Sequence, residues 1–427
     1  MQPACTLELF TNQSWQAAAT VRPQGEIRRG WKGAIRCDYA TEWVLAHFGA
    51  QDARSVSASW PVGLEGTATP HWPGFLVDLL PQGFARQHLI QRLGYVSDPE
   101  GPVDWQLLCC GAGNPIGNLR VREAAHWLAS QPRLNRGFAD EDLINLSDPF
   151  LEAAASTALL TTGSSGMQGE WPKLMLTRAH DGLLYLDHEL PDDQAAEHFI
   201  AKLQLGSDTI RATILRHEAV YSLIADHLGL RVHKPAVHQG RALFISRFDR
   251  QVHNGGVRRF AQESLASLTQ RAGFEQLPSH NEVCAALART CRDPVKEVLE
   301  YLLRDVTNLA LGNKDNHARN TAIQRDEQGG IRLTPIFDLA PMFLHPDGLA
   351  RRMRWVGEQL GQPDWAVVID QLSPLVDAQV LTQGLKTFAP RLESVLKHGV
   401  EMGISPELMQ PIRASLAGQL KALEAVK

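Results

Sequence analysis

The segment 312–320, with the sequence GNKDNHARN, is the feature that most constrains what this chain can fold into. Apolar residues flank it on both sides: Val306, Leu309 and Leu311 precede it, and Ala322 and Ile323 follow it. A polar cluster between apolar runs has either a function or a structural partner. Two interpretations fit the segment alone, namely an Asn/Asp-rich turn with a capping role and a functional loop.

Three oxygen-bearing side chains around this segment have the spacing that phosphoryl transfer needs. Asp315 and Asn320 are five residues apart, and Asp338 ends a short apolar run that follows a hairpin with a glycine turn. In kinases one acid accepts a hydroxyl proton, while an amide oxygen and a second acid hold Mg²⁺ against the phosphates of ATP. The functional interpretation therefore predicts Asp315 as the proton acceptor, with Asn320 and Asp338 as metal ligands.

The composition is that of an ordinary soluble globular protein, with 44% hydrophobic and 21% charged residues in a chain of 427. This length predicts two or three subdomains. A net charge of −5 argues against a dominant nucleic-acid surface. The chain has no apolar run long enough to span a bilayer and no signal-peptide pattern at its start. Its six cysteines form no C-x-x-C pair, so we expect a cytoplasmic, reduced and zinc-free protein.

The first 125 residues are expected to be rich in strands. Residues 6–10 and 16–21 have the pattern of two strands around a polar turn, and residues 55–62 alternate as a half-buried strand does. A helix is predicted over 84–93. The glycine-rich stretch 107–119 is interpreted as a strand–turn–strand connection. A phosphate-binding loop is the alternative, but its spacing matches no nucleotide-binding motif.

A lysine and a glutamate suggest a second half of the same site. Lys202 lies in an apolar strand, and lysines are rarely buried without a partner. Either this strand is an edge that faces water or Lys202 contacts an anion. Glu218 lies on an amphipathic helix predicted over 213–228. A strand lysine paired with a helix glutamate is the kinase arrangement for holding ATP phosphates, and a solvated surface glutamate is the alternative.

The last third of the chain is predicted to be helical. A strongly apolar helix is expected over 295–311, and residues 351–427 are mainly helical with prolines between the helices. Three arginines, Arg351, Arg352 and Arg354, form a basic cluster soon after Asp338. A solvated loop is the commoner explanation of such a cluster, and contact with phosphates or with a peptide substrate is the alternative.

Several separated motifs resemble those of the HipA family, the serine/threonine-kinase toxins of bacterial toxin–antitoxin systems. The resemblance runs over most of the chain. Its weaker matches are FLVDLLPQG at 75–83 and the glycine turn at 111–117. The more specific ones are RFDR at 247–250 and GNKDNHARN at 312–320, joined by FDL at 337–339 and by the glycine loop at 163–166 with Lys173.

The resemblance implies a catalytic role for Asp315 and Lys202. Asp315 would be the general base on a serine or threonine hydroxyl, and Lys202 would bind the phosphates of ATP. Asn320 and Asp338 would hold Mg²⁺. His317 is expected to hold the loop through hydrogen bonds at the edge of the ATP site.

The resemblance also implies an autophosphorylation site in the glycine loop. Ser164 or Ser165 would carry the phosphate, which ejects the loop and blocks ATP binding, as an added dianion near a triphosphate should. Ser246 and Phe248 would border the adenine. The other residues expected at the ATP site are Lys173, Glu218 and Asp249.

The implied fold is α+β: a HipA-like, two-lobed protein-kinase-like core with an N-terminal α/β subdomain and an all-helical C-terminal lobe. The expected domains are a HipA-type subdomain over 1–125, an N-lobe with the glycine-rich loop over 126–250, and a mainly helical C-lobe over 251–427. The implied partners are a protein substrate such as an aminoacyl-tRNA synthetase and a small helix-turn-helix antitoxin. DNA would be contacted only through the antitoxin, and no membrane is involved.

Two other functions remain open from the sequence. One is a small-molecule kinase with the same core, which would phosphorylate a sugar, an aminoglycoside or a nucleoside. The other is a catalytically silent ATP-binding co-regulator that works through an antitoxin. The joint presence of Asp315, Asn320, Asp338 and Lys202 favours the protein kinase over both.

Overall fold

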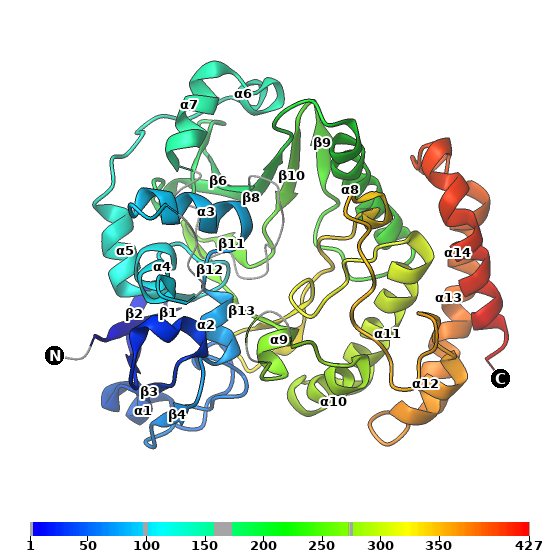
Figure 1. Ribbon diagram of the computed structural model, residues 1–427, viewed down its shortest axis with the longest axis horizontal. Coiled ribbons are helices and arrows are strands. Elements are labelled where there is room, and N and C mark those ends of the chain that lie inside the picture. Colours follow the sequence, from blue (N-terminus) through cyan, green and yellow to red (C-terminus); the bar gives the residue numbers. More distant parts are fainter. Residues whose placement is uncertain (1–2, 97–100, 158–172, 272, 274–275, 427) are drawn as a thin grey trace. The chain divides into compact units, whose positions relative to one another are not determined.

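The computed structural model describes residues 3–96, 101–157, 173–271, 273 and 276–426 (Figure 1). The chain divides into two compact units, each built from segments that are distant in the sequence. Unit 1 contains Met1–Leu205, Gln239–Gln276 and Ala322–Ile331, and unit 2 contains Gly206–His238, Leu277–Thr321 and Arg332–Lys427. The three-part division at residues 125 and 250 stays a prediction, because compactness alone separates two units.

Unit 1 begins with a five-stranded sheet in the order β4-β3-β2-β1-β5. The predicted strand pair is confirmed, because β1 and β2 run antiparallel from Cys5 opposite Val21 to Thr11 opposite Ser14. Every residue of β1 except Thr6 is buried, and Leu7 and Leu9 belong to two different apolar clusters. The strands are β1 (Cys5–Thr11), β2 (Ser14–Pro23), β3 (Ile35–Tyr39), β4 (Thr67–Thr69) and β5 (Leu119–Val121).

The strand predicted over residues 55–62 is wrong, since only an isolated bridge joins Ser57 to Trp60 there. The hydroxyl of Ser55 donates to the carbonyl oxygens of Asp52 and Ser57 at 3.0 and 2.9 Å. Such local side-chain hydrogen bonds satisfy the backbone without a strand ladder. The segment with alternating apolar and polar residues is therefore a buried, turn-rich segment and not a strand.

Short helices pack with this sheet around one apolar core, which includes Leu76, Leu89, Leu107 and Leu108. The helix predicted over 84–93 is confirmed as α3. The connection at residues 107–119 is helix–turn–strand, because its apolar start belongs to a helix; a short apolar run does not distinguish helix from strand. The elements are η1 (Ile27–Lys32), α1 (Thr41–His47), α2 (Gly74–Asp78), α3 (Gly83–Arg92), α4 (Asp104–Gly111) and α5 (Arg122–Ala129).

A second five-stranded sheet has the order β7-β6-β8-β10-β9, so β8 lies in its interior. The apolar strand predicted around Lys202 is confirmed as β8. Phe138, Phe150 and Leu176 belong to its core. The elements are α6 (Asp140–Asn145), α7 (Asp148–Thr157), β6 (Lys173–Ala179), β7 (Leu184–Leu186), η2 (Asp192–Gln194), β8 (Ala195–Leu203), β9 (Val237–Gln239) and β10 (Ala242–Ser246).

The remaining strands of the described residues form two small sheets. One pairs β11 with β12, and the other has the order β13-β14-β15, in which β14 and β15 form the hairpin predicted before Asp338. The elements are β11 (Arg250–His253), β12 (Gly256–Arg259), β13 (Ala261–Ser264), α9 (Leu265–Leu268), β14 (Ala322–Arg325) and β15 (Ile331–Leu333).

Unit 2 is mainly helical, as predicted for the C-terminal part. The long helices α13 and α14 lie side by side (Figure 1), and α14 also packs on α11. Within the described residues, no helix has both the length and the apolar composition needed to cross a membrane. The elements are α8 (Thr209–His227), α10 (His280–Thr290), α11 (Pro294–Leu311), η3 (Met342–Leu344), α12 (Trp365–Leu372), α13 (Ala378–His398) and α14 (Pro406–Glu424).

Candidate active site

Helix α11 ends at the glycine that begins the predicted catalytic loop. Asp293 caps the helix start by accepting from the backbone N of Lys296 at 3.2 Å, and Pro294 follows where no donor is needed. At the other end Gly312 has a φ of 72°, and a Cβ there would lie 2.7 Å from Cδ1 of Phe343. Any side chain at this position would strain the backbone and clash, so glycine is required where the loop leaves the helix.

Asn313 connects the loop to the backbone of Asp338. Its Nδ2 donates to Oδ1 of Asn308 at 2.8 Å and to the carbonyl oxygen of Asp338 at 3.4 Å, while its Oδ1 accepts from the backbone N of Asp315 at 3.3 Å. The structure therefore brings the two predicted acids into one site within unit 2. Asp338 has a φ of 53°, a left-handed value that costs energy in a non-glycine residue and is typical of functional sites.

Asp315 and Asn320 differ in exposure in a way that suits different roles. The side chain of Asp315 is 34% exposed, so a substrate hydroxyl can reach its carboxylate. Nδ2 of Asn320 donates to the carbonyl oxygen of Asp315 at 2.8 Å, and its buried Oδ1 has no hydrogen-bond partner among the described residues. A buried oxygen without a donor is costly, and a bound cation would satisfy it.

The oxygen atoms at this site fit Mg²⁺ that arrives with a nucleotide. Mg²⁺ is usually held by one or two protein oxygens, with phosphates and water completing its coordination. Asn320 and Asp338 offer an amide oxygen and a carboxylate of that kind. Elsewhere in the described part of the chain, no group of three or more His, Cys, Asp or Glu side chains is placed to hold a metal by itself.

His317 is held inside the loop as a neutral imidazole. Burial lowers its pKa to about 4, and the cations of Arg319 and Arg352 act in the same direction, against the carboxylate of Asp338. Its Nδ1 accepts from the backbone N of Arg319 at 3.3 Å, and its carbonyl oxygen accepts from the backbone N of Asn320 at 2.8 Å. These bonds are the ones a loop-holding residue needs, while a contact of His317 with ATP stays a prediction.

We expect His317 to weaken the fold at acid pH. Because its pKa of about 4 in the folded state lies below the value of 6.5 for a free side chain, the unfolded chain binds the proton first as the pH falls. Stability is then lost between pH 6.5 and 4, by about 2 kcal/mol at pH 5. Urea unfolding at pH 7 and pH 5 should show a smaller difference in His317→Gln than in the wild type. His398→Gln, at an exposed site, is the control, and an unchanged pH dependence in His317→Gln would contradict the expectation.

Two lysines of unit 1 lie opposite each other in the second sheet. Lys173 of β6 pairs in register with Lys202 of β8. Lys202 is buried in an interior strand, so the edge strand facing water is the wrong alternative for it. Directly opposite residues on a sheet have neighbouring side chains, so one anion can contact both lysines. This arrangement suits phosphate binding.

The RFDR segment forms a buried ion cluster with Asp187. Arg247 contacts Asp249 at 2.7 Å and Asp187 at 3.2 Å, and Arg250 contacts Asp187 at 2.9 Å. All four side chains are nearly inaccessible, so these ion pairs are not the weak salt bridges of an exposed turn. Both carboxylate oxygens of Asp249 accept hydrogen bonds here, one also from the backbone N of Gly117. The geometry thus gives Asp249 a structural role, and its contact with a nucleotide stays a prediction.

For the remaining predicted site residues the structure gives fewer contacts. The hydroxyl of Ser246 donates to Oε1 of Glu197 at 2.9 Å, and Phe248 is half-buried. Glu218 is buried on α8 in unit 2, whereas Lys202 belongs to unit 1, so their pairing stays a prediction. Ser164 and Ser165 lie outside the described residues.

Comparison with known protein families decides which family this chain belongs to. The family model of the HipA-like C-terminal domain matches residues 165–389, which include Lys202, the RFDR segment and the whole loop 312–320. The chain belongs to the HipA family. The resemblance noted in its motifs is therefore confirmed.

Two known proteins share nearly the full length of this HipA-family chain. A curated protein of Sinorhizobium fredii, named "Putative kinase Y4mE", is 26% identical over 426 residues, 93% of this chain and 95% of that protein. The HipA of Shewanella oneidensis, solved with HipB and operator DNA, has a TM-score of 0.66 at 17% identity and covers 98% of this chain and 96% of its own. At that identity the likeness establishes the fold, which is α+β, two-lobed and kinase-like as predicted.

Sequence reasoning missed the residues that bind the RFDR segment in the ion cluster of this HipA-family chain. Asp187 follows β7, and its Oδ1 accepts from the hydroxyl of Thr177 at 2.7 Å and lies 2.9 Å from Nδ1 of His198. The carbonyl oxygen of Pro115, in the glycine turn, accepts from Arg247 and Arg250 at 3.1 and 3.3 Å. The two buried arginines of RFDR were the only signal in the sequence that such acceptors are needed.

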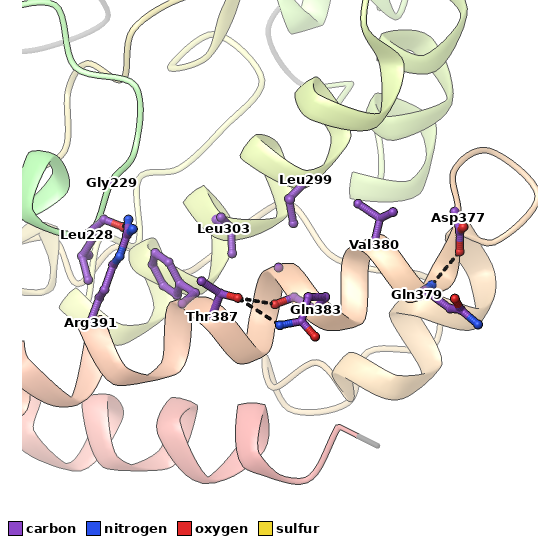
Figure 2. A pocket seen from close by; sticks show the side chains of 12 residues that line it. Leu228, Gly229, Leu299, Leu303, Asp377, Gln379, Val380, Gln383, Thr387 and Arg391 are labelled. Carbon is purple, nitrogen blue, oxygen red and sulfur yellow. Dashed lines mark hydrogen bonds between the residues drawn. The ribbon is translucent and has the colours of Figure 1, made fainter.

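A separate pocket of about 510 Å³ lies in unit 2 of this HipA-family chain (Figure 2). Leu299 and Leu303 of α11 face Val380 of α13 across it, and Arg391 closes one end by donating to the carbonyl oxygen of Leu228 at 3.0 Å. None of the predicted site residues lines the pocket. It is therefore distinct from the loop that carries Asp315.

Proposed function

We propose that this HipA-family chain is an ATP- and Mg²⁺-dependent kinase that phosphorylates serine or threonine residues of a protein. The observation that carries the proposal is the buried, unpartnered Oδ1 of Asn320 beside the accessible carboxylate of Asp315, with Asp338 fixed to the same loop. The name of the S. fredii relative and the toxin–antitoxin complex of the S. oneidensis protein support it.

Each residue of the proposed active site has one task in the reaction. Asp315 orients the acceptor hydroxyl and takes its proton as the oxygen attacks the γ-phosphorus of ATP, and ADP leaves with the electron pair of the broken bond. Lys202, with Lys173 opposite, holds phosphate oxygens. Asn320 and Asp338 hold Mg²⁺, which neutralises charge on the phosphates when it is bound.

Further parts of the proposal come from the family resemblance. A serine of the glycine loop, Ser164 or Ser165, is the autophosphorylation site, and Ser246, Phe248 and Glu218 lie at the nucleotide. The protein substrate is a translation component such as an aminoacyl-tRNA synthetase. The partner is a small helix-turn-helix antitoxin, in line with the HipB bound to the S. oneidensis HipA.

Labelling with γ-³²P-ATP separates this function from its alternatives. The proposed kinase transfers label to serine or threonine of itself or of a lysate protein, and loses this activity when EDTA is added. A small-molecule kinase would label only small acceptors such as sugars, aminoglycosides or nucleosides. A silent co-regulator would bind ATP without releasing ADP, and either of these two results would replace the proposal.

Asn320→Ala should raise the Mg²⁺ concentration needed for half-maximal activity by roughly tenfold or more. The substitution removes the oxygen that the structure leaves buried without a partner. Asn320→Asp keeps an oxygen at this position and should stay much closer to the wild type. Magnesium titrations of the labelling rate test both variants, and an unchanged Mg²⁺ requirement in Asn320→Ala would exclude Asn320 as a ligand.

A further inference from the structure

The segment 351–358 of unit 2 belongs to no helix or strand and ends in a turn, and its side chains alternate between the interior and the surface over residues 351–356. Met353 and Trp355 are buried, and the side chain of Arg351 is only 9% exposed. Arg352 and Arg354, between them, are exposed. In the basic cluster noted in the sequence, Arg351 therefore faces inward, whereas Arg352 and Arg354 face outward.

The carboxylate of Asp305 on α11 holds this segment beside the catalytic loop. Its Oδ2 accepts from Nη2 of Arg351 and from Nε1 of Trp355, both at 2.8 Å. Its Oδ1 accepts from Nδ2 of Asn316, the residue after Asp315, at 3.3 Å. One buried carboxylate thus binds both the segment and the neighbour of the proposed general base.

Other contacts hold the same segment in place. Oε1 of Glu358 accepts from Arg351 at 3.1 Å and from Arg354 at 2.8 Å. The carbonyl oxygen of Arg354 accepts from the backbone N of His280 at 3.0 Å, and the backbone N of Val356 donates to Oδ1 of Asn281 at 2.8 Å. The segment is therefore held by α10 as well as by α11, and Arg351 and Arg354 are neutralised by acids of this chain.

Arg352 differs from its two neighbours. Within the described residues it forms no ion pair, and it directly follows Arg351, which shares the carboxylate of Asp305 with Asn316 of the catalytic loop. Lys314, directly before Asp315, is exposed and likewise forms no ion pair in the described part of the chain. Two cations are thus available to an anion that approaches Asp315 from solvent.

We propose that the segment 351–358 binds the acceptor protein, and that Arg352 and Lys314 recognise carboxylates beside the serine or threonine to be phosphorylated. The inference rests on the proposed function and specifies its substrate as an acidic site. Asp305 acts as a positioning residue, because it holds the segment at the loop without reaching the acceptor.

A serine peptide library with varied flanking positions tests the substrate class. The full-length protein is incubated with γ-labelled ATP, Mg²⁺ and the library, and peptides with Glu or Asp next to the serine should be selected. For a matched Glu and Gln peptide pair, Arg352→Gln should reduce the preference in kcat/KM by roughly three- to fivefold, the value of one exposed ion pair. The KM for ATP should not change.

Two further variants keep the test decisive. Arg413→Gln removes an exposed arginine of α14, outside the segment, and it should keep the wild-type preference. Asp305→Asn should weaken the preference while Arg352 and Lys314 remain, and it should shift the fluorescence of Trp355, whose indole N–H loses its charged acceptor. The fluorescence reports on the segment without relying on activity.

The outcomes separate this inference from the proposed function. If the wild type labels itself or a lysate protein but selects no acidic peptide, the inference fails and the kinase stands. A preference unchanged in Arg352→Gln, or a rise in the KM for ATP alone, also overturns the inference, because the guanidinium then serves the nucleotide. Absence of any label transfer by the wild type would overturn the proposed function itself.

Discussion

Asp315→Asn should lower the rate of phosphoryl transfer by about 10²- to 10⁴-fold, because it removes the proton acceptor that also orients the hydroxyl. The fold should tolerate the change, since Asp315 contributes its backbone N and carbonyl oxygen to the loop through Asn313 and Asn320. ATP affinity should stay within roughly twofold, because Asp315 acts on the acceptor and not on the nucleotide.

The measurement is the single-turnover rate of label transfer, with ATP affinity followed by calorimetry. Asp347→Asn is the matched control: the same substitution in unit 2, at a carboxylate that is 77% exposed and outside the loop. Transfer at the wild-type rate in Asp315→Asn would exclude Asp315 as the general base. Loss of ATP binding in the same variant would show that the loop itself had collapsed.

Asp187→Ala should destabilise unit 1 by about 3–5 kcal/mol, the typical cost of removing one partner from a buried ion pair. Arg247 and Arg250 are 0% and 1% exposed in their side chains, and Asp249 alone would then face both. Burial lowers the pKa of Arg250 to about 9, so this cation keeps its proton at neutral pH and remains a buried charge. Denaturant unfolding followed by circular dichroism measures the loss.

Asp38→Asn provides the comparison at the surface. Asp38 contacts Arg22 and Arg36 at 3.2 and 2.8 Å, but its side chain is 29% exposed and those of the arginines about 45%. Roughly 0–1 kcal/mol is the expected cost for such a pair. Equal effects of Asp38→Asn and Asp187→Ala would refute the view that burial makes the cluster important.

The same cluster predicts how stability changes with pH. Burial alone would raise the pKa of Asp187, but Arg250 and Arg247 outweigh it and hold this pKa well below its usual range. The stability that Asp187 contributes is therefore present above the pKa of an unfolded aspartate and is lost as the pH falls toward its folded-state value. Asp187→Ala should accordingly flatten the acid side of the stability profile.

The catalytic loop could be predicted from sequence because its determinants are local. Gly312 ends a strongly periodic helix, Asp315 and Asn320 follow at fixed spacing, and a hairpin returns the chain to Asp338. Each of these features depends on residues close in the chain. The prediction of Lys202 as a buried lysine had the same basis, a cation within an apolar strand.

The parts that sequence could not supply depend on distant partners. Nothing around Asp187 in the chain indicates Arg247 or Arg250, about sixty residues away. The inward position of Arg351 depends on Asp305, 46 residues earlier on another helix. At residues 55–62 the predicted strand is wrong for a local reason, because hydroxyl hydrogen bonds replace the strand ladder. Tertiary contacts decided the first two cases.

The ion cluster also determines which parts of the chain can be removed or exchanged in engineered variants. The family model begins at residue 165, yet Arg247 and Arg250 donate to the carbonyl oxygen of Pro115, and Asp249 accepts from Gly117. A chain cut to the matched segment would leave buried charges without these partners. Exchanging the first 125 residues between relatives should therefore succeed only when the turn that carries Pro115 and Gly117 is exchanged together with its RFDR segment.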